Sequence, residues 1–336
     1  DYHPYRFMLE ALIGVSVLVA VSRVARKYRF SLRLFARVVG GGVALQVALL
    51  LVAGNNSAIA RIAVAPLGNM GFYPDIHAFG GLAALGMACG LAMASFRDSV
   101  RWERVFGGIC MLLCANGIAL SRSRALEFLV FPFAVLALGV TNPFRLNKWV
   151  GLAVAAVLLA GGAFFIATHY EEILARTNPL HISRAIEEQD WNRLNAWTGF
   201  RLEIWQAALR IWAEAPILGT GPGSFVRLSS LRSLAESKYL FEAGGQNAHN
   251  YFVQILVERG LLGLGLTLVA FFPMFTHGRV VAVITGAFIL SNVYAHSLLV
   301  PDFFMLLAIF AGVVGAGSHV WKPTAKWMLI LILGCL

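Results

Sequence analysis

The sequence predicts an all-α fold, a polytopic bundle of transmembrane helices with a large folded loop outside the membrane. Of its 336 residues, 59% are hydrophobic and only 13% are charged, whereas soluble domains are about half apolar and about a quarter charged. Long apolar runs recur along the chain, and about 17–25 apolar residues are enough to cross the hydrocarbon layer. These runs lack the alternation of a membrane β-barrel, so helices must satisfy the backbone inside the bilayer.

Charge in the connections between the apolar runs predicts how the helices are oriented. The expected spans are 7–22, 38–54, 76–96, 105–120, 125–141, 149–168, 251–276, 280–299 and 303–320. Alternate connections hold 14 Lys and Arg residues, and the short connections on the other side hold 3. The positive-inside rule places the basic set in the cytoplasm. The chain then starts outside, and residues 169–250 lie outside as well.

This topology divides the chain into three parts and explains its net charge of +10. Residues 1–168 are expected to be transmembrane helices, 169–250 an outer loop domain, and 251–336 the C-terminal helices. The first residue is Asp, and we expect further helices to precede it. The outer loop is near neutral, so the excess positive charge lies on the cytoplasmic face, where it meets anionic lipids. Basic residues scattered over inner loops do not indicate nucleic-acid binding.

The outer segment contains an amphipathic helix with Thr198 as the expected N-cap and Pro216 as the stop signal. Eight residues share its helical spacing: Trp197, Phe200, Arg201, Ile204, Trp205, Ala208, Leu209 and Trp212. Indole rings favour the headgroup layer, so this helix either lies against the bilayer surface or packs on the membrane domain. The pattern alone does not choose between these two arrangements.

A glycine-rich segment follows that helix. Gly219, Gly221 and Gly223 surround Pro222, and side chains would obstruct so tight a turn. Such a turn can also offer backbone N–H groups to a phosphate. Because the spacing fits neither of the common nucleotide-binding loops, a turn with a structural role is the preferred interpretation.

Arginines gather at the predicted outer boundary of the membrane. Arg61 lies in an outer loop, Arg122 and Arg124 lie in a very short outer turn, and Arg201 lies on the amphipathic helix. Guanidinium groups held at a membrane boundary are costly unless they pair with an anion, and they match phosphate oxygens well. A structural role is the alternative for each, such as pairing of Arg124 with Glu127 or snorkelling of Arg61.

His249 and Asn250 stand where the outer segment meets the next apolar helix. A helix N-terminus disfavours a protonated imidazole, so His249 is expected to be neutral near pH 7, as a general base must be. Asn250 can orient a substrate hydroxyl, and it is also a good helix N-cap. Glu258 lies within the same helix and is a structural candidate. The sequence contains no clustered metal-binding motif, so a metal site is not predicted.

These residues resemble a known family. His249 and Asn250, followed after nine residues by Gly260 and Gly263, look like the H-[NSQ]-x9-G-x-x-G signature of bacterial O-antigen ligases, the WaaL family. Three further stretches resemble the wider ligase and polymerase superfamily: residues 123–125, Arg201 with Trp205, and Pro216 with residues 219–223. The resemblance covers roughly residues 55–300. Family members usually have about twelve spans, with the large loop after the ninth, whereas six precede it here.

The resemblance implies a metal-independent, inverting glycosyltransferase of the GT-C type, without a cofactor, at the periplasmic face of the bacterial inner membrane. It would move polysaccharide from undecaprenyl diphosphate to lipid A–core. His249 would be the base, while Arg124, Arg201 and, more weakly, Arg61 and Arg122 would bind the diphosphate. Gly260, Gly263 and Gly265 are expected to let a neighbouring helix approach closely and so to fix the helix that carries His249.

Two rival functions remain at this point. The first is an O-antigen polymerase or protein O-oligosaccharyltransferase of the same superfamily, which differs in the acceptor. The second is a secondary transporter. Sparse charge within the predicted spans disfavours a transporter, because transporters carry polar sites near the bilayer midplane.

Overall fold

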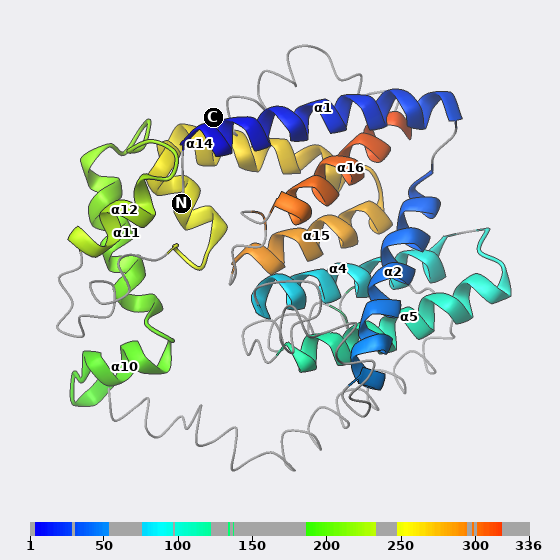
Figure 1. Ribbon diagram of the computed structural model, residues 1–336, viewed down its shortest axis with the longest axis horizontal. Coiled ribbons are helices and arrows are strands. Elements are labelled where there is room, and N and C mark those ends of the chain that lie inside the picture. The colour runs from blue at the N-terminus through cyan, green and yellow to red at the C-terminus, as the bar shows by residue number, and fades with distance from the viewer. Residues whose placement is uncertain are drawn as a thin grey trace.

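The computed structural model describes residues 4–28, 31–53, 76–96, 98–121, 186–232, 247–293 and 301–317, together with 134, 137 and 298. Within these ranges the secondary structure is helical (Figure 1). The helices are α1 (Pro4–Tyr28), α2 (Leu32–Ala53), α4 (Ile76–Ser95), α5 (Arg101–Leu120), α10 (Trp191–Trp197), α11 (Arg201–Glu214), α12 (Ser224–Arg232), α14 (Tyr251–Thr276), α15 (Arg279–Val293) and α16 (Pro301–Gly317).

Most of the apolar helices share one large core. Helices α1, α2, α4, α5, α15 and α16 contribute to it, and α14 joins it through residues such as Phe271 and Met274. Two of the described helices, α2 over Leu32–Val52 and α14, are long and apolar enough to cross a membrane, and shorter apolar helices lie beside them. The predicted runs 125–141 and 149–168 fall almost entirely outside the described residues. The run expected over 280–299 forms α15, which ends at Val293.

Small residues allow α4 and α5 to pack very closely. A Cβ atom added to Gly90 would lie 2.7 Å from the carbonyl oxygen of Gly107, and one added to Gly86 would lie 2.7 Å from the Sγ atom of Cys114. Side chains larger than hydrogen would therefore push the two helices apart. Cys110 and Cys114 are fully buried at this crossing, where they act as small apolar side chains.

Arginines from α2 form ion pairs with Asp98, between α4 and α5, and with Glu103, in the first turn of α5. Arg37 donates hydrogen bonds to the buried carboxylate of Glu103, one of them with an Nε-to-oxygen distance of 3.0 Å, and Arg33 pairs with Asp98. The Arg37 guanidinium also lies 5.1 Å from the ring centre of Trp102. Burial alone would raise the pKa of the Glu103 carboxyl. The hydrogen bonds from Arg37 and from the Val100 N–H, together with the nearby positive charges, outweigh burial, so the pKa of Glu103 is lowered. Glu103 precedes the predicted span 105–120.

A second, smaller core lies beside the first part of α14. Ile204, Ala207, Ala208 and Ile211 form the buried face of α11, and they pack with Phe225 of α12, Ala248 and Val257. Figure 1 shows α11 and α12 next to α14 and away from α2, α4 and α5. The buried face of α11 therefore packs on protein, which was one of the two arrangements that the sequence left open.

The predicted start of the amphipathic helix was wrong. Trp197 ends α10, and Thr198 is the C-cap of that helix instead of the N-cap of the next. Gly199 and Phe200 follow with φ angles of 65° and 63°, and two successive left-handed residues reverse the chain before α11 begins at Arg201. The predicted end was correct, because α11 finishes at Glu214, two residues before Pro216.

Candidate active site

The junction between the outer segment and α14 holds His249 in an unusual backbone conformation. The φ angle of His249 is 47°, a left-handed value that few residues other than glycine adopt. Its N–H donates to the side-chain oxygen of Asn247 at 2.9 Å. Asn250 then caps α14, because its Oδ1 accepts from the N–H groups of Phe252 and Val253 at 2.9 and 3.1 Å. The imidazole is half-buried, with its Nδ1 atom inside the protein.

A chain of buried polar groups fixes this junction from within α14. The Ala248 N–H donates to Oε1 of Gln254 at 3.2 Å, and Nε2 of Gln254 donates to Oε1 of Glu258 at 3.0 Å. Gln254 is 1% exposed and Glu258 is 3% exposed. The Glu258 carboxyl also accepts hydrogen bonds from the backbone N–H groups of Gly223 and Phe225, at the start of α12. The residue before His249 is thereby linked to the glycine-rich turn.

Helix α14 is broken at Gly260, and the glycine-rich turn fills the break. Gly260 has φ 63° and ψ −166°, which is outside the helical region. The N–H groups of Leu261 and Leu262 donate to the carbonyl oxygens of Pro216 and Ile217 at 2.9 and 3.1 Å. In return, two N–H groups of the turn donate to carbonyl oxygens that precede the break: Thr220 to Val257 at 3.0 Å and Gly221 to Glu258 at 2.9 Å.

These contacts show what the signature glycines touch. A Cβ atom at Gly219 would overlap the backbone of Glu258 and Arg259, and one at Gly260 would overlap the backbone of Ile217. The close neighbour of Gly260 is therefore a turn and not the packed helix that the sequence suggested. At Gly263 an added Cβ would overlap the Arg259 side chain of its own helix, and at Gly265 it would meet nothing within 4 Å among the described residues, so the close helix predicted at Gly265 was wrong.

The glycine-rich turn does not present its central N–H groups to a ligand. The N–H groups of Thr220 and Gly221 are used by the carbonyl oxygens of α14, and the N–H of Gly223 is used by Glu258. Of the two interpretations given above, the geometry favours the structural turn over a phosphate-binding loop. Gly219, Gly221 and Gly223 all have positive φ angles, which accounts for three glycines in so short a segment.

Arg201 begins the helix that packs against the His249 junction. Its Nη1 donates to the carbonyl oxygen of Thr198 at 3.1 Å, and its side chain is half-buried. One turn later on the same face, Nε1 of Trp205 donates to the carbonyl oxygen of Ala248 at 3.0 Å. Residues four apart on a helix are about 6 Å apart. The helix that carries Arg201 is thus joined directly to the residue before His249.

The other predicted arginines, Arg61, Arg122 and Arg124, lie outside the described residues. Of the predicted charged and polar site residues, the structure therefore places His249, Asn250 and Arg201. It shows His249 and Asn250 adjacent at the start of α14, and it shows α11 docked onto the same junction.

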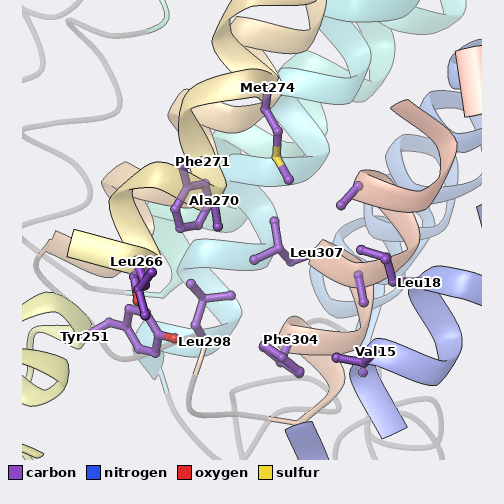
Figure 2. Close-up of a pocket in the computed structure, with 14 residues that line it drawn as sticks. Val15, Leu18, Tyr251, Leu266, Ala270, Phe271, Met274, Leu298, Phe304 and Leu307 are labelled. Atoms are coloured by element: carbon purple, nitrogen blue, oxygen red, sulfur yellow. The ribbon is translucent and has the colours of Figure 1, made fainter. Parts of the chain in front are cut away.

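An apolar cavity lies next to this junction, between α1, α14 and α16. Figure 2 shows Tyr251, two residues after His249, at one end of it and Met274 at the other. The walls include residues from all three helices: Val15, Leu18, Leu266, Phe271, Phe304 and Leu307. The described site is therefore polar at the start of α14 and apolar below it.

The fold and this site define a helical membrane protein with a polar centre at the start of α14. Residues 109–268 match the family model described as O-antigen ligase, so this part of the chain is similar to that family. The matched segment contains Arg201, the glycine-rich turn, the His249 junction and the break in α14.

One curated relative is an uncharacterized protein of Haemophilus influenzae. It is 25% identical over 228 residues, which cover 67% of this chain and 52% of the relative. The chain spans about half the length of that relative.

Three residues that organise the site escaped the sequence analysis in part or in full. Gln254 was not singled out, Glu258 was given no partner, and Trp205 was noted on a helical face and beside Arg201 in the family resemblance, without a partner. The sequence did contain a signal for Gln254 and Glu258. Polar residues four apart in an apolar helix share one face, and when buried they need hydrogen-bond partners.

Proposed function

We propose that this protein ligates polysaccharide carried on undecaprenyl diphosphate to a sugar hydroxyl of lipid A–core, at the periplasmic face of the bacterial inner membrane. The reaction is a metal-independent glycosyl transfer with inversion at the anomeric carbon. The observation that carries the proposal is His249, held in a left-handed conformation between two side-chain caps, inside a segment that matches the O-antigen ligase family.

His249 is the general base in this proposal. Its imidazole nitrogen takes the proton of the acceptor hydroxyl while the hydroxyl oxygen attacks the anomeric carbon. The bond from that carbon to the diphosphate oxygen breaks, and the diphosphate leaves with the electron pair. The first turn of α14 supports a neutral imidazole, because the positive end of a helix disfavours a second positive charge. Strained residues such as His249 concentrate at functional sites.

Arginines stabilise the diphosphate leaving group. A departing diphosphate needs positive charge more than it needs a proton, and guanidinium groups supply both charge and paired hydrogen-bond donors. Arg201 fits this role because α11 is tied to the His249 junction through Trp205. We assign Arg124, Arg61 and Arg122 to the same anion, on the basis of the predicted topology and the family resemblance. Asn250 contributes to acceptor binding beside its capping role.

The apolar cavity below Tyr251 has a volume of about 70 Å³, which is too small for a whole undecaprenyl chain. Its walls are aliphatic and aromatic side chains from three helices, so it offers an apolar contact for a short part of the donor lipid. Such a contact would leave the diphosphate near the start of α14, next to His249.

Cells that lack the protein provide the test. Ligation is supported if undecaprenyl-linked polysaccharide accumulates with its normal distribution of chain lengths while lipid A–core remains unmodified. Loss of long chains, with single repeat units remaining, would identify a polymerase instead. Loss of glycans from a secreted protein, with lipopolysaccharide unchanged, would identify a protein O-oligosaccharyltransferase. Reintroduction of the wild-type gene is the control for each outcome.

A further inference from the structure

The tip of the glycine-rich turn is an exposed apolar surface. Ile217 is 65% exposed and Leu218 is 70% exposed. They lie beside Leu261 and Leu262, which are 54% and 53% exposed, because the backbone hydrogen bonds across the break in α14 join the two segments. Four large aliphatic side chains thus form one patch, which we call the turn patch. Contiguous apolar surfaces of this kind mark places of contact with another apolar phase.

The turn patch continues an apolar stripe along α14. The exposed large residues after Leu262 in this helix are Leu268, Val269, Phe272 and Phe275. Phe272 lies four residues after Leu268 and three after Val269, and Phe275 lies three further on, so all four share one helical face. Because α14 is long and apolar enough to cross a membrane, this exposed face is its lipid-facing side. Ile217 and Leu218 extend that side beyond the break.

The length of α14 gives the depth of the turn patch. Residues 261–276 extend about 24 Å at about 1.5 Å per residue, and polar residues follow at His277 and Arg279. A hydrocarbon layer is about 30 Å thick. If the end of α14 lies at one boundary of the hydrocarbon layer, the break at Gly260 lies within that layer, about 6 Å from its opposite boundary. The turn that hydrogen-bonds to the break would then lie inside the hydrocarbon layer too.

The hydrogen bonding of the turn fits an apolar surrounding. Backbone groups that face lipid must be satisfied within the protein, and the carbonyl oxygens of Pro216 and Ile217 accept from Leu261 and Leu262. The Pro216 oxygen also accepts from Nε1 of Trp212 at 3.1 Å. An indole with one polar contact and an apolar body is suited to the boundary between lipid and headgroups.

We propose that Ile217 and Leu218 insert into the acyl chains of the leaflet in which α14 begins, so that the glycine-rich turn anchors the α11–α12 unit to the membrane. The occupant of the turn patch is therefore lipid. This inference does not depend on the proposed reaction. It explains how a site at the start of α14 is held at the depth where a lipid-linked substrate presents its headgroup.

Spin-label accessibility tests the proposal. Ile217→Cys and Leu218→Cys are each labelled in lipid nanodiscs, in a background in which Cys335 is replaced by Ala, since Cys89, Cys110 and Cys114 are buried. The background protein without an added cysteine reports any residual labelling. Phe272→Cys is the matched control for a lipid-facing position, and Arg227→Cys on α12 is the control for an exposed polar position. Each variant must keep a melting temperature within a few degrees of the wild type. Power saturation then measures how often each spin label collides with oxygen, which dissolves in lipid, and with a water-soluble nickel complex.

The proposal expects labels at 217 and 218 to collide more often with oxygen than with the nickel complex, as at 272. It is overturned if the nickel complex reaches them as readily as it reaches position 227. It is also overturned if both reagents are excluded, because the patch would then be covered by protein, such as a second copy of the chain.

Discussion

Gly260→Ala is the substitution whose cost follows most directly from the structure. A φ of 63° with a ψ of −166° is accessible almost only to glycine, and forcing another residue there costs about 1–3 kcal/mol. The added methyl group would also overlap the carbonyl of Ile217. Moving that carbonyl breaks the hydrogen bond that it accepts from the Leu262 N–H, which is worth about 1 kcal/mol. The total destabilisation is about 2–4 kcal/mol.

Thermal unfolding of the purified protein measures this effect. Gly260→Ala should lower the melting temperature by about 5 °C and should reduce glycan transfer, because the break positions the turn and the His249 junction. Gly265→Ala is the matched control in the same helix: an added Cβ there meets nothing within 4 Å, and alanine favours a helix by about 1 kcal/mol. Equal melting temperatures for the two variants would refute the assigned role of the break.

Three further predictions concern charged groups. Arg201→Lys should reduce transfer at least about tenfold, because a point charge cannot replace the planar fork, whereas Arg210→Lys on the exposed face of α11 should match the wild type in the same assay. Glu258→Ala should lower the melting temperature more than Glu258→Gln does, since only the smaller side chain leaves buried donors unsatisfied; equal losses would argue against the buried network. The pKa of Glu103 is lower in the folded protein than its ordinary value of 4.5. The ionised carboxylate therefore stabilises the fold fully above pH 4.5, and this stabilisation is lost as the pH falls through the lowered pKa of the folded state. Melting temperatures between pH 6 and pH 3.5 should therefore fall more steeply for the wild type than for Glu103→Gln, and parallel curves would contradict this.

The helical architecture of the described residues was predictable because hydrocarbon leaves the backbone few choices. The apolar run 76–96 corresponds to α4 within one residue, whereas α2 begins at Leu32, six residues before the run 38–54. The break in α14 was not predictable in the same way. Its sequence reads as one continuous apolar helix, and the compensating hydrogen bonds come from a turn about forty residues earlier in the chain.

The candidate site was predictable in its residues more than in its geometry. The spacing of His249, Gly260 and Gly263 is a local signal, and so is the capping preference of Asn250. The connection from Trp205 to Ala248 and the relay through Gln254 and Glu258 depend on how α11, α12 and α14 pack together. Periodicity does report which residues share a helical face, but it does not report which partner that face meets.

The direct test of the central claim is the transfer rate of His249→Ala. The purified protein, in lipid nanodiscs, is given undecaprenyl-diphosphate-linked polysaccharide and lipid A–core, and ligated product is measured over time. His277→Ala, at the opposite end of α14, is the matched control, and melting temperatures confirm that both variants are folded. A general base contributes about 10²–10⁴-fold, so His249→Ala should lose at least about a hundredfold in rate, while His277→Ala stays near the wild type. A folded His249→Ala variant that transfers glycan at the wild-type rate would contradict the account.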